Sequence, residues 1–365
     1  MKIAILVDNL EHGGVASAAI GFYRAFKKYY DCNIDFIVYK QPTQKTKEQF
    51  ARQGTNIFVI PSFSKSGYFH YQRNLAKILS ADEPYDAIHM HTGQFIWIAA
   101  KQAKKLKIKN RVGHAHGSAV CENSLIRSIL KNIAALVGRI LNKKYCTALF
   151  ACSDKAGKFN FSSDYVLLPN LVDLENICQE YPVSFRNDFN LSSCDKVLGY
   201  LGVFGIDKNT TFLIDIMENF RADNISCIMA GDGPEYENVK TRIQERSLQD
   251  KITLLGYRND GNRLLKFFDV LVAPSYSEGM SLTLLEAQLT GTPCIVSSGI
   301  PKTNDLKFGL YYEVADFNPI NWKDTIIRAL SDKHELTFAQ RVEKLQEIGY
   351  DENTVAQELY EAYTK

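Results

Sequence analysis

The sequence of 365 residues lacks any run of about 18 apolar residues, the length of a transmembrane helix, so no membrane-spanning segment is predicted. Its first residues, MKIAILVDNL, become polar at Asp8, which is too soon for a signal peptide, and we expect a buried first strand there. The eight cysteines include no Cys-x-x-Cys pair, and several lie within apolar runs. We therefore expect reduced cysteines in the core of a cytosolic protein, with neither a disulfide framework nor a structural zinc site.

Two signatures of cofactor-dependent proteins are also absent. No Asp-x-Asp triplet occurs, which argues against a diphosphate bridged to the protein by a metal ion. The segment GDGPEY, residues 231–236, begins like a dinucleotide-binding fingerprint but has Tyr236 where the third glycine belongs, so NAD binding is disfavoured. The sequence thus predicts no bound metal and no cofactor.

Charge is unevenly divided between the two halves of the chain. Residues 1–180 carry a net charge of +10 and residues 181–365 a net charge of −8, which together give the formal +2 of the whole chain. The first half should therefore favour an anionic partner. Nucleic acid is a poor choice for that partner, because no known binding module or aromatic platform accompanies the charge.

Acidic side chains are missing altogether from residues 123–153, a segment with helical periodicity. Its basic residues are Arg127, Lys131, Arg139, Lys143 and Lys144. Its apolar residues on the adjoining face are Ile129, Ile133, Leu136 and Ile140. Such a helix either lies on an anionic membrane surface or is an ordinary helix with a solvated basic side.

The length exceeds that of a usual single core, so two domains are expected. Short β-branched or apolar runs alternate with longer amphipathic stretches, the pattern of a parallel sheet with helices on both faces. The strands predicted in the first half are residues 2–7, 34–39, 56–60, 87–91, 111–116 and 148–153. Those predicted in the second half are residues 197–202, 226–231, 252–256, 270–275 and 293–297.

Helices are predicted at residues 15–29, 94–107, 209–220, 235–247, 261–268, 281–290, 319–331 and 352–364. The fold class is therefore α/β, with two doubly wound parallel sheets and ligands at the carboxyl ends of the strands, in a cleft between the domains. We place an N-terminal domain at residues 1–170, a linker at 171–194 and a C-terminal domain at 195–345. The last segment, 346–365, holds a helix that is a candidate to pack back on the first domain.

The most informative stretch is PSYSEGMSLTLLEAQLTGTPCIVS, residues 274–297, in which a loop joins a buried strand to a helix. Gly279 lets the backbone approach a ligand closely because it has no side chain. The amides of Met280, Ser281 and Leu282 are expected to be unpaired donors at a positive helix end, an arrangement that suits a phosphate.

Two acidic residues lie eight positions apart around this helix start. Glu286 is embedded in an apolar stretch where an unpaired charge is costly, and it is near enough to the helix start to bond ribose hydroxyls. Glu278 precedes the helix and would project to the other side of the diphosphate, where a sugar sits. The alternative is that both are solvated surface carboxylates.

The pattern S-E-G-x-S-L-x-L-L-E-A, followed by G-T-P-C-I-V-S, resembles the signature of family 4-type (group 1) retaining glycosyltransferases with the GT-B fold. The likeness extends over nearly the whole chain, because individually weak motifs follow in the expected order. They are GGV at 13–15, YDAIHMH at 85–91, KKLKIKNRVGHAHG at 104–117, ACSDKAGKF at 151–159, LLPNLVD at 167–173, GDGPE at 231–235 and LLGYRND at 254–260. The chain looks most similar to the bacterial branch that builds capsular and exopolysaccharides. The resemblance implies two Rossmann-like domains that face a central cleft.

The resemblance also implies roles for single residues. Glu286 would hold the ribose of the donor and Glu278 the hydroxyls of its sugar. His116, at the end of a strand, would face the donor sugar across the cleft. Gly233 lies in the loop that borders the nucleotide, and Arg258 would flank the base.

The assignment of His116, and that of Gly13 and Gly14, keep an alternative open. His114 and His116 point to one face of a strand, so a metal-binding pair and a core position are the competing interpretations of His116. Gly13 and Gly14 either lend amides to the diphosphate or form a tight turn.

Lys208 follows the strand VLGYLG and a turn that contains Gly205. Departure of the leaving group builds negative charge on the β-phosphate, and a positioned ammonium stabilises that charge most in the transition state. The family supplies an arginine and a lysine from this stretch, but here Val203 stands at the arginine position. Either Lys208 and helix amides suffice, or another cation such as Arg258 replaces the arginine, or activity is weak or absent. A surface position is the alternative for Lys208.

The resemblance therefore implies a metal-independent hexosyltransferase in cell-surface polysaccharide synthesis. It would move a hexose from a nucleotide diphosphate sugar, UDP-linked by family analogy, to a hydroxyl of a glycan or lipid-linked acceptor, with retention. We expect a cytoplasmic protein whose basic half is the side that would meet the inner face of the membrane. The alternatives are a degenerate nucleotide-sugar-binding subunit that partners an active enzyme, and an epimerase or phosphorylase that uses the same cleft.

Overall fold

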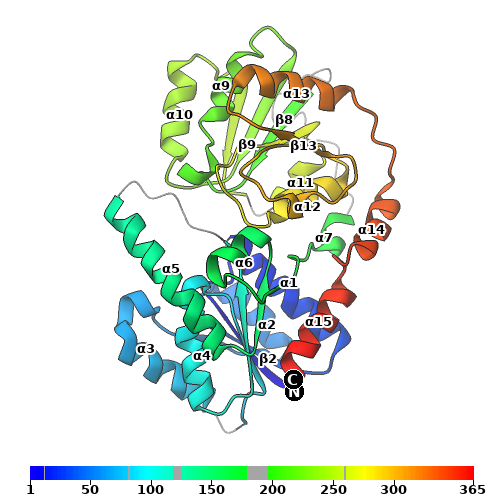
Figure 1. The fold of residues 1–365 in the computed structure, drawn as a ribbon. Helices are drawn as coiled ribbons and strands as arrows, with labels where there is room; N and C mark the ends of the chain where they lie inside the picture. Colours follow the sequence, from blue (N-terminus) through cyan, green and yellow to red (C-terminus); the bar gives the residue numbers. More distant parts are fainter. Residues whose placement is uncertain (12, 81–82, 118–124, 179–195, 259) are drawn as a thin grey trace. The chain divides into compact units, whose positions relative to one another are not determined.

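The computed structural model of the chain describes residues 1–11, 13–80, 83–117, 125–178, 196–258 and 260–365, and of residues 125–132 it describes the backbone alone. The described chain forms two compact units (Figure 1). The first comprises Met1–Leu171 together with Gly349–Lys365, and the second comprises Val172–Ile348. Of the linker predicted at 171–194, the part from residue 179 lies outside the described residues, and Leu174–Cys178 form helix α7.

The first unit holds a sheet of seven parallel strands in the order β3-β2-β1-β4-β5-β6-β7. Its strands are β1 (Lys2–Val7), β2 (Asn33–Val38), β3 (Ile57–Val59), β4 (Ala87–Met90), β5 (Asn110–Ala115), β6 (Ala148–Ala151) and β7 (Val166–Leu167). Its helices are α1 (Gly14–Tyr29), α2 (Gln44–Arg52), α3 (Phe63–Leu79), η1 (Gly93–Phe95), α4 (Ile96–Lys105), α5 (Leu125–Tyr145), α6 (Asp154–Asn160) and α15 (Glu352–Thr364).

Helices α1 and α15 cover one face of this sheet, although they lie at opposite ends of the sequence. Alternate residues of β1 point into a buried cluster with the aromatic side chains of α1, because successive strand residues face opposite sides. Helix α15 adds Val355, Ala356, Leu359, Ala362 and Tyr363 to the same cluster. Tyr360 stacks on Tyr30 with ring centres 4.5 Å apart, and Lys28 pairs with Glu352 at 2.7 Å.

The second unit holds a sheet of six parallel strands in the order β10-β9-β8-β11-β12-β13. Its strands are β8 (Lys196–Leu201), β9 (Ile225–Ala230), β10 (Ile252–Gly256), β11 (Val270–Ala273), β12 (Cys294–Ser297) and β13 (Tyr311–Val314). Its helices are α7, η2 (Ile206–Lys208), α9 (Phe212–Glu218), α10 (Tyr236–Glu245), α11 (Gly261–Leu265), α12 (Leu282–Thr290), η3 (Lys302–Asn304), α13 (Pro319–Ser331) and α14 (Phe338–Glu347).

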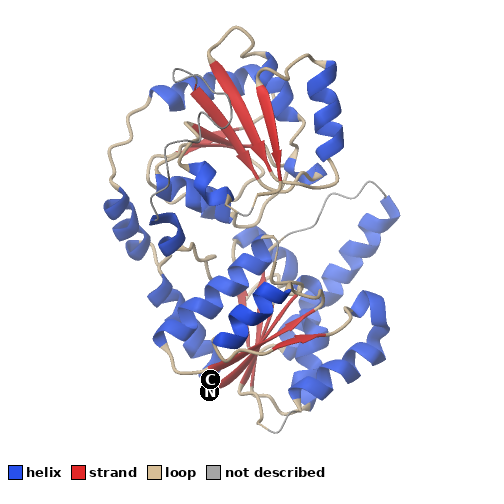
Figure 2. Ribbon diagram, turned by 180° about the vertical axis from the view of Figure 1, so that it is seen from behind, coloured by secondary structure: helices blue, strands red, loops and turns tan. Residues whose placement is uncertain are grey.

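Strand β8 shows how this sheet is covered on both faces. Leu198 and Tyr200 point into a cluster with residues of α9, α10 and α13, including the fully buried Trp322. Val197 points the other way, into a cluster with α11 and with Leu284 of α12. Figure 2 shows helices on both sides of each sheet. The predicted α/β fold with two parallel sheets is confirmed.

In both sheets the first strand of the sequence is an interior strand, with a neighbour on each side. The neighbours of β1 are β2 and β4, and the neighbours of β8 are β9 and β11. The connections that follow two adjacent central strands leave in opposite directions at this position, which is called the switch point. The loops at the carboxyl ends of these two strands therefore diverge and leave room for a ligand. The topology therefore directs attention to the loops after β1 and β4 and to those after β8 and β11.

Several elements escaped prediction because they bury few apolar residues. Helix α2 buries only Phe50, β7 pairs two half-exposed residues, and Val314 is the one buried residue of β13. Helix α3 is kinked at Gly67, which has φ +73°, so its period is broken. Helix α14 was also missed. The strand predicted at 148–153 ends at Ala151, because the Ser153 side chain caps helix α6.

Candidate functional site

In the second unit, the loops that follow the adjacent strands β8 and β11 meet at the switch point. The chain after β8 forms η2, and the chain after β11 forms the loop that leads to α12. The backbone N–H of Tyr276 donates to the carbonyl oxygen of Asp207 at 2.8 Å, which joins the two loops. The Nζ atom of Lys208 lies 2.7 Å from Oε1 of Glu278. Two residues predicted for the site are thus in direct contact.

Glu278 is bound from two sides, and its charge balances that of Lys208. The hydroxyl of Ser275 donates to Oε1 of Glu278 at 2.8 Å, and Nζ of Lys208 also lies 3.6 Å from the carboxylate of Asp207. The side chains of Lys208 and Glu278 are 23% and 15% exposed, so water screens their pairing only partly. An incoming diphosphate therefore has to compete with Glu278 for the ammonium of Lys208.

The N-terminus of α12 has fewer free backbone amides than the sequence predicted. The backbone N–H of Ser281 donates to Oδ1 of Asn304 at 2.7 Å, so the prediction of a free amide at Ser281 is wrong. Met280, another residue of the predicted amide set, has a buried side chain. Leu282 is the first residue of the helix, where backbone amides have no acceptor within the helix. The helix can thus offer a phosphate the amides that follow Ser281.

Asn304, which the sequence did not single out, clamps this loop from η3. It is fully buried, and its Nδ2 atom donates to the carbonyl oxygens of Gly279 and Pro301, both at 3.0 Å. The buried side chain of Gln288 donates in turn to the carbonyl oxygen of Asn304 at 2.7 Å. The amide of Asn304 therefore fixes the backbone on both sides of Met280, and no local pattern in the sequence indicates such a contact.

Glu286 occupies the middle of α12. It is half-buried, between the buried side chains of Leu285 and Ala287, and does not project freely into bulk water. The helix therefore presents this carboxylate one turn beyond the clamped loop, on the same element as Leu282.

The loops after β8 and β9 are bound together through glycines. A Cβ atom on Gly233 would lie 2.6 Å from the carbonyl oxygen of Phe204, and Gly233 has φ +155°. The N–H of Phe204 donates to the carbonyl oxygen of Asp232 at 3.0 Å. Packing alone therefore explains the glycine at position 233, because a larger residue would clash with the backbone of Phe204. Val203, at the position of the family arginine, is 52% exposed.

Arg258 is engaged by a neighbouring acid. Its Nε and Nη2 atoms donate to the two carboxylate oxygens of Asp260 at 2.8 and 2.7 Å. This bidentate interaction lowers the pKa of Asp260 and balances the charge of the guanidinium. Arg258 is therefore a weak substitute for the arginine that is absent at Val203.

In the first unit, β4 and β5 bring four histidines together at the carboxyl ends of the strands. Nδ1 of His91 lies 2.7 Å from Nε2 of His116, and Nε2 of His89 lies 3.3 Å from Nδ1 of His114. His89, His91 and His114 are buried, while His116 is half-buried at the edge of the cluster. The sequence pointed to His114 and His116 but not to their partners on β4, because pairing of parallel strands is a property of the sheet.

A metal ion is one interpretation of this histidine cluster. His89, His91 and His114 each place a ring nitrogen within 4.8 Å of the other two. The 2.7 Å between His91 and His116, however, is shorter than the roughly 3.3 Å expected between two nitrogens bound at about 2.0 Å to one tetrahedral zinc ion. That pair has the spacing of a hydrogen bond, and among the described residues the set that fits a shared ion is His89, His91 and His114.

Gly13 and Gly14 follow β1 and begin α1. Gly13 has φ +95° and its carbonyl oxygen accepts from the N–H of Ser17 at 3.2 Å, so it forms the tight turn that opens the helix. The two glycines lie at the switch point of the first sheet, next to the strand that carries His91. Their role toward a diphosphate stays a prediction.

Comparison with known proteins shows which family the chain is similar to. Residues 184–350 match the model of the family described as glycosyl transferases group 1. EpsF of Bacillus subtilis (strain 168) is 27% identical over 362 residues, which cover 96% of this chain and 93% of that protein. The UDP-Gal:alpha-D-GlcNAc-diphosphoundecaprenol alpha-1,3-galactosyltransferase of Escherichia coli is 30% identical over 245 residues, 62% of this chain and 60% of that enzyme. The second half of the chain therefore matches the group 1 glycosyltransferases, and nearly the whole chain is similar to a protein named as a glycosyltransferase.

The fold of the chain also has close counterparts among solved structures. HepE (Alr3699) of Anabaena, solved in complex with UDP, aligns with a TM-score of 0.79 at 17% identity, over 99% of both chains. The two parallel sheets with their flanking helices are therefore those of the GT-B fold.

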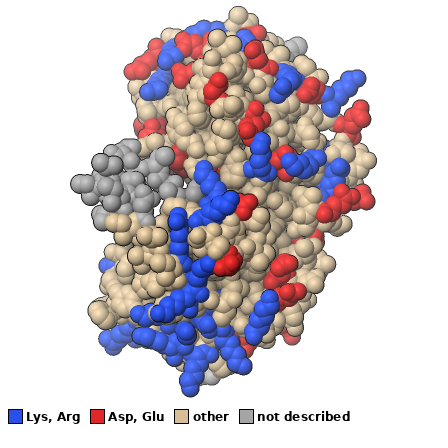
Figure 3. Space-filling view, viewed as in Figure 1, with Lys and Arg blue, Asp and Glu red and all other residues tan. Residues whose placement is uncertain are grey.

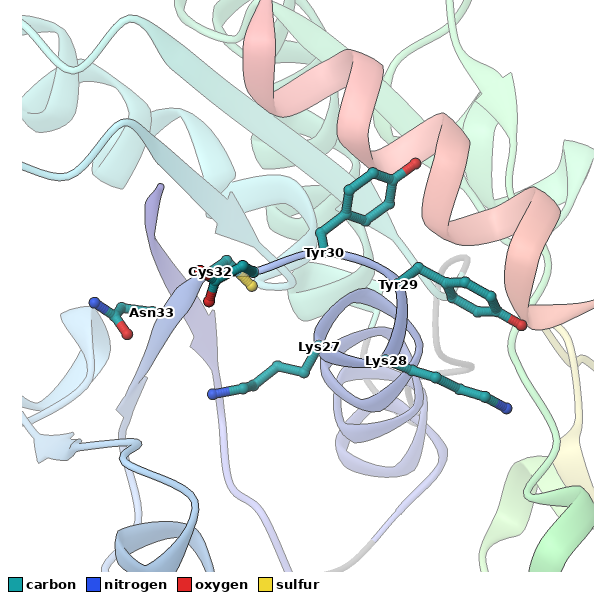
Figure 4. A pocket seen from close by; sticks show the side chains of 7 residues that line it. Lys27, Lys28, Tyr29, Tyr30, Cys32 and Asn33 are labelled. Carbon is teal, nitrogen blue, oxygen red and sulfur yellow. The ribbon is translucent and has the colours of Figure 1, made fainter.

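A surface pocket of the first unit lies at the opposite end of its sheet from the histidine cluster. It has a volume of about 370 Å³ and is lined by Lys27, Lys28, Tyr29, Tyr30, Asp31, Cys32 and Asn33. Figure 4 shows Lys27 and Lys28 pointing in opposite directions, and Lys28 is paired with Glu352. The pocket lies where β2 begins, at the amino end of the sheet, which is the wrong end for the ligand of a doubly wound fold.

Helix α5 is the predicted basic amphipathic helix, and its described part carries apolar side chains on the surface. Ile133, Leu136, Val137 and Ile140 are 54%, 56%, 43% and 64% exposed, at the spacing of one helix face. Helix α5 and the neighbouring α4 also carry several basic side chains, and Figure 3 shows Lys and Arg gathered on the first unit. The side chains of Arg127, Ile129 and Lys131 lie outside the described residues.

Among the described helices of the chain, none combines the length and the apolar character of a transmembrane span.

Proposed function

We propose that this glycosyltransferase moves a hexose from a UDP-linked donor to a hydroxyl of a glycan or lipid-linked acceptor in cell-surface polysaccharide synthesis, with retention and without a metal ion. One observation carries the proposal. The loops after β8 and β11 meet at the switch point and bring Lys208 and Glu278 into contact, with Glu286 on the helix that follows. A cation for a phosphate and a carboxylate for hydroxyls are the two groups that a nucleotide sugar needs.

The similar proteins support the choice of donor and acceptor. HepE of Anabaena was solved with UDP and with UDP-glucose, and the Escherichia coli relative is named for transfer of galactose from UDP-Gal to a diphosphoundecaprenol-linked sugar. In this chain Lys208 would support the charge of the departing diphosphate once Glu278 turns to the sugar hydroxyls. His116, Gly13 and Gly14 would contribute from the first unit, and Gly233 and Arg258 would line the nucleotide.

Nucleotide binding tests the donor assignment. UDP or a UDP-sugar at 100 times its Kd should stabilise the protein by about 2.7 kcal/mol, because a ligand that binds only the folded state adds its binding free energy to stability. Melting temperature is measured with UDP, UDP-glucose, UDP-galactose, GDP and NAD, with and without EDTA. We expect a shift with the uridine nucleotides that EDTA leaves unchanged.

Two variants of the same unit sharpen this measurement. Glu286→Ala should lose most of the shift, whereas Glu245→Ala, an exposed carboxylate on α10, should keep it. A protein that no nucleotide stabilises, or equal shifts for both variants, contradicts the donor assignment. The anomeric configuration of the product, read by NMR, decides between retention and inversion.

A second candidate is a nucleotide-sugar-binding subunit without catalytic activity. It is favoured by Val203 in place of the family arginine and by the engagement of Arg258 with Asp260. Of the cations predicted for the diphosphate, Lys208 then remains. Cleavage of a UDP-sugar by the purified chain alone excludes this candidate. Binding without cleavage, in the presence of acceptors, supports it.

Helix α5 supports an anionic membrane as a further partner. We expect the protein to sediment with vesicles that contain phosphatidylglycerol and to stay in solution with pure phosphatidylcholine, because a basic helix with an exposed apolar stripe gains from both charge and burial. Binding should fall steeply with salt. Leu136→Glu with Ile140→Glu should weaken it at least tenfold, about 1.4 kcal/mol.

The matched control for the vesicle experiment lies in the second unit. Ile320 on α13 is 59% exposed, so Ile320→Glu places one such charge on an equally open apolar position. It should leave vesicle binding unchanged. If it reduces binding as much as the α5 changes, or if the wild type ignores anionic vesicles, helix α5 is not a membrane contact.

A further inference from the structure

Two exposed aromatic side chains lie in contact at the carboxyl end of the second sheet. Tyr276 belongs to the loop after β11, and Phe317 belongs to the turn between β13 and α13. They are 46% and 40% exposed, and their ring centres lie 5.0 Å apart with the ring planes at 66°. The edge of one ring therefore meets the face of the other, and the pair forms a corner with two apolar walls. An open aromatic corner at the ligand end of a doubly wound sheet is a candidate binding surface.

Buried groups hold Phe317 in place from beneath. Its ring lies 5.4 Å from Phe212 of α9, perpendicular to it, and 6.3 Å from the fully buried Trp322 of α13, nearly parallel to it. The indole N–H of Trp322 donates to the carbonyl oxygen of Asp316 at 2.6 Å, and the N–H of Asn318 donates to Oδ1 of Asp316 at 3.1 Å. The backbone on both sides of Phe317 is thus fixed. A ligand that contacts this ring loses little binding free energy to the ordering of the protein.

Tyr276 is joined to the proposed donor site through its backbone. Its N–H donates to the carbonyl oxygen of Asp207 at 2.8 Å, in the loop that also carries Lys208. The preceding residue, Ser275, donates through its hydroxyl to Oε1 of Glu278 at 2.8 Å. The ring of Tyr276 is therefore carried by the same short loop that orients the carboxylate of Glu278.

The aromatic pair and helix α12 are associated with opposite faces of the sheet. Phe212 and Trp322, which support Phe317, belong to the buried cluster beneath α9 and α13, whereas α12 packs on the cluster of the other face. In the proposed function, α12 holds the ribose through Glu286 and the donor sugar reaches Glu278. The aromatic pair lies on the side of Glu278 that is away from the nucleotide. The reactant that remains to be bound on that side is the acceptor.

We propose that Tyr276 and Phe317 form a subsite for a sugar ring of the acceptor. The proposal rests on the proposed function and adds the chemistry of the group that binds. A pyranose ring whose axial C–H bonds point to one side has an apolar face, and this face is complementary to the apolar, electron-rich face of an aromatic ring. The pair is small, flat-walled and rigid, so it suits a ring better than a flexible lipid chain. The acceptor group that fits is therefore the glycan.

Saturation-transfer NMR on the full chain tests the subsite with simple glycosides. The aromatic protons of the protein are saturated in the presence of UDP, and the probes are methyl β-D-glucopyranoside, methyl β-D-galactopyranoside and methyl N-acetyl-β-D-glucosaminide. We expect transfer to the ring C–H protons of at least one probe, strongest on its axial C–H face. Glycerol has hydroxyls but no ring and should receive none. If no glycoside receives saturation, or if glycerol receives as much, the proposal is overturned.

Variants connect this signal to the aromatic pair. Tyr276→Leu and Phe317→Leu keep an apolar side chain but remove the flat face, so affinity for the best glycoside should fall about threefold to tenfold. Tyr276→Phe keeps the ring and should stay within about twofold of the wild type. The matched control is Tyr360→Leu in the first unit, since Tyr360 is also 40% exposed and stacks on Tyr30. Equal affinities in Tyr276→Leu and Tyr276→Phe, or an equal loss in Tyr360→Leu, contradict the subsite.

Affinity for UDP separates this proposal from the donor assignment. Tyr276→Leu and Phe317→Leu should bind UDP as the wild type does, because the proposed nucleotide site lies on the α12 side. A loss of UDP affinity as large as the loss of glycoside affinity would mean that the variants disturb the loop of Glu278, and the proposal would be withdrawn. If the glycosides bind but UDP does not, the proposed function fails while the aromatic subsite stands. If UDP binds but no glycoside does, the subsite fails and the donor assignment stands.

Discussion

Replacement of Lys208 by alanine is expected to lower cleavage of the donor about 100- to 1,000-fold, the range seen when one preorganised charge-stabilising group is removed. The reason lies in the geometry around Glu278. Lys208 is held 2.7 Å from that carboxylate, and no other cation among the described residues is bound there, since Arg258 is engaged by Asp260. Initial rates of UDP release from the UDP-sugar that binds best, with and without acceptor, give the measurement.

The control for Lys208 is the lysine at the other end of the same strand, β8. Lys196 begins β8 and pairs with Asp269 at 2.9 Å, at the opposite end of the strand from Lys208. Lys196→Ala removes an ion pair of similar length but lies at the amino end of the sheet, so the rate should change less than threefold. Equal losses in the two variants would mean that Lys208 acts only on stability. An unchanged rate in Lys208→Ala would support the non-catalytic candidate.

Acid should destabilise the first unit well before the carboxylates titrate. Burial lowers the pKa of His116 to about 4 and of His89 to about 3, so the unfolded chain, with ordinary histidines near 6.5, binds more protons than the folded chain below that pH. Stability contributed by the neutral rings is complete above about pH 6.5 and is lost as pH falls toward 4 and then 3. From pH 7.5 to pH 5 each of these two histidines should cost about 2 kcal/mol, a large share of the stability of a domain.

Thermal or urea unfolding between pH 7.5 and 4.5 measures this loss. His116→Asn should flatten the pH dependence, because asparagine does not titrate, although it lowers stability at pH 7.5. His70→Asn, a change at an exposed histidine of α3, should leave the slope as it is. A pH profile that is the same in wild type and His116→Asn contradicts neutral histidines in the core of the first unit.

Local sequence patterns were enough to predict most of the fold. Runs such as KIAILV and ALFA lie in strands because apolar side chains on both faces of a parallel sheet leave near-continuous apolar stretches. Helix 319–331 was predicted with its observed ends, where Asn318 caps the first turn and Pro319 begins the helix. Elements with one buried residue, such as α2 and β13, give no such pattern and were missed.

Only part of the candidate site could be predicted from the sequence. Lys208 and Glu278 follow strands that the sequence placed correctly, so their meeting follows from strand order. The clamp on Ser281 could not be anticipated, because Asn304 reaches it from 23 positions away through a short η3 turn. His91 was likewise missed, since its partner on the neighbouring strand lies 25 positions along the chain. Contacts of this kind depend on how elements pack and leave no mark in the residues themselves.

The return of α15 to the first unit sets an order of folding during synthesis. The second unit is one continuous stretch, so its core is complete once residue 348 has been made. The core of the first unit still lacks Val355, Leu359 and Tyr363 at that moment. The part of the protein that begins the chain is therefore the last to close. Until it does, the apolar surface of α1 that α15 covers is open to chaperones and to aggregation.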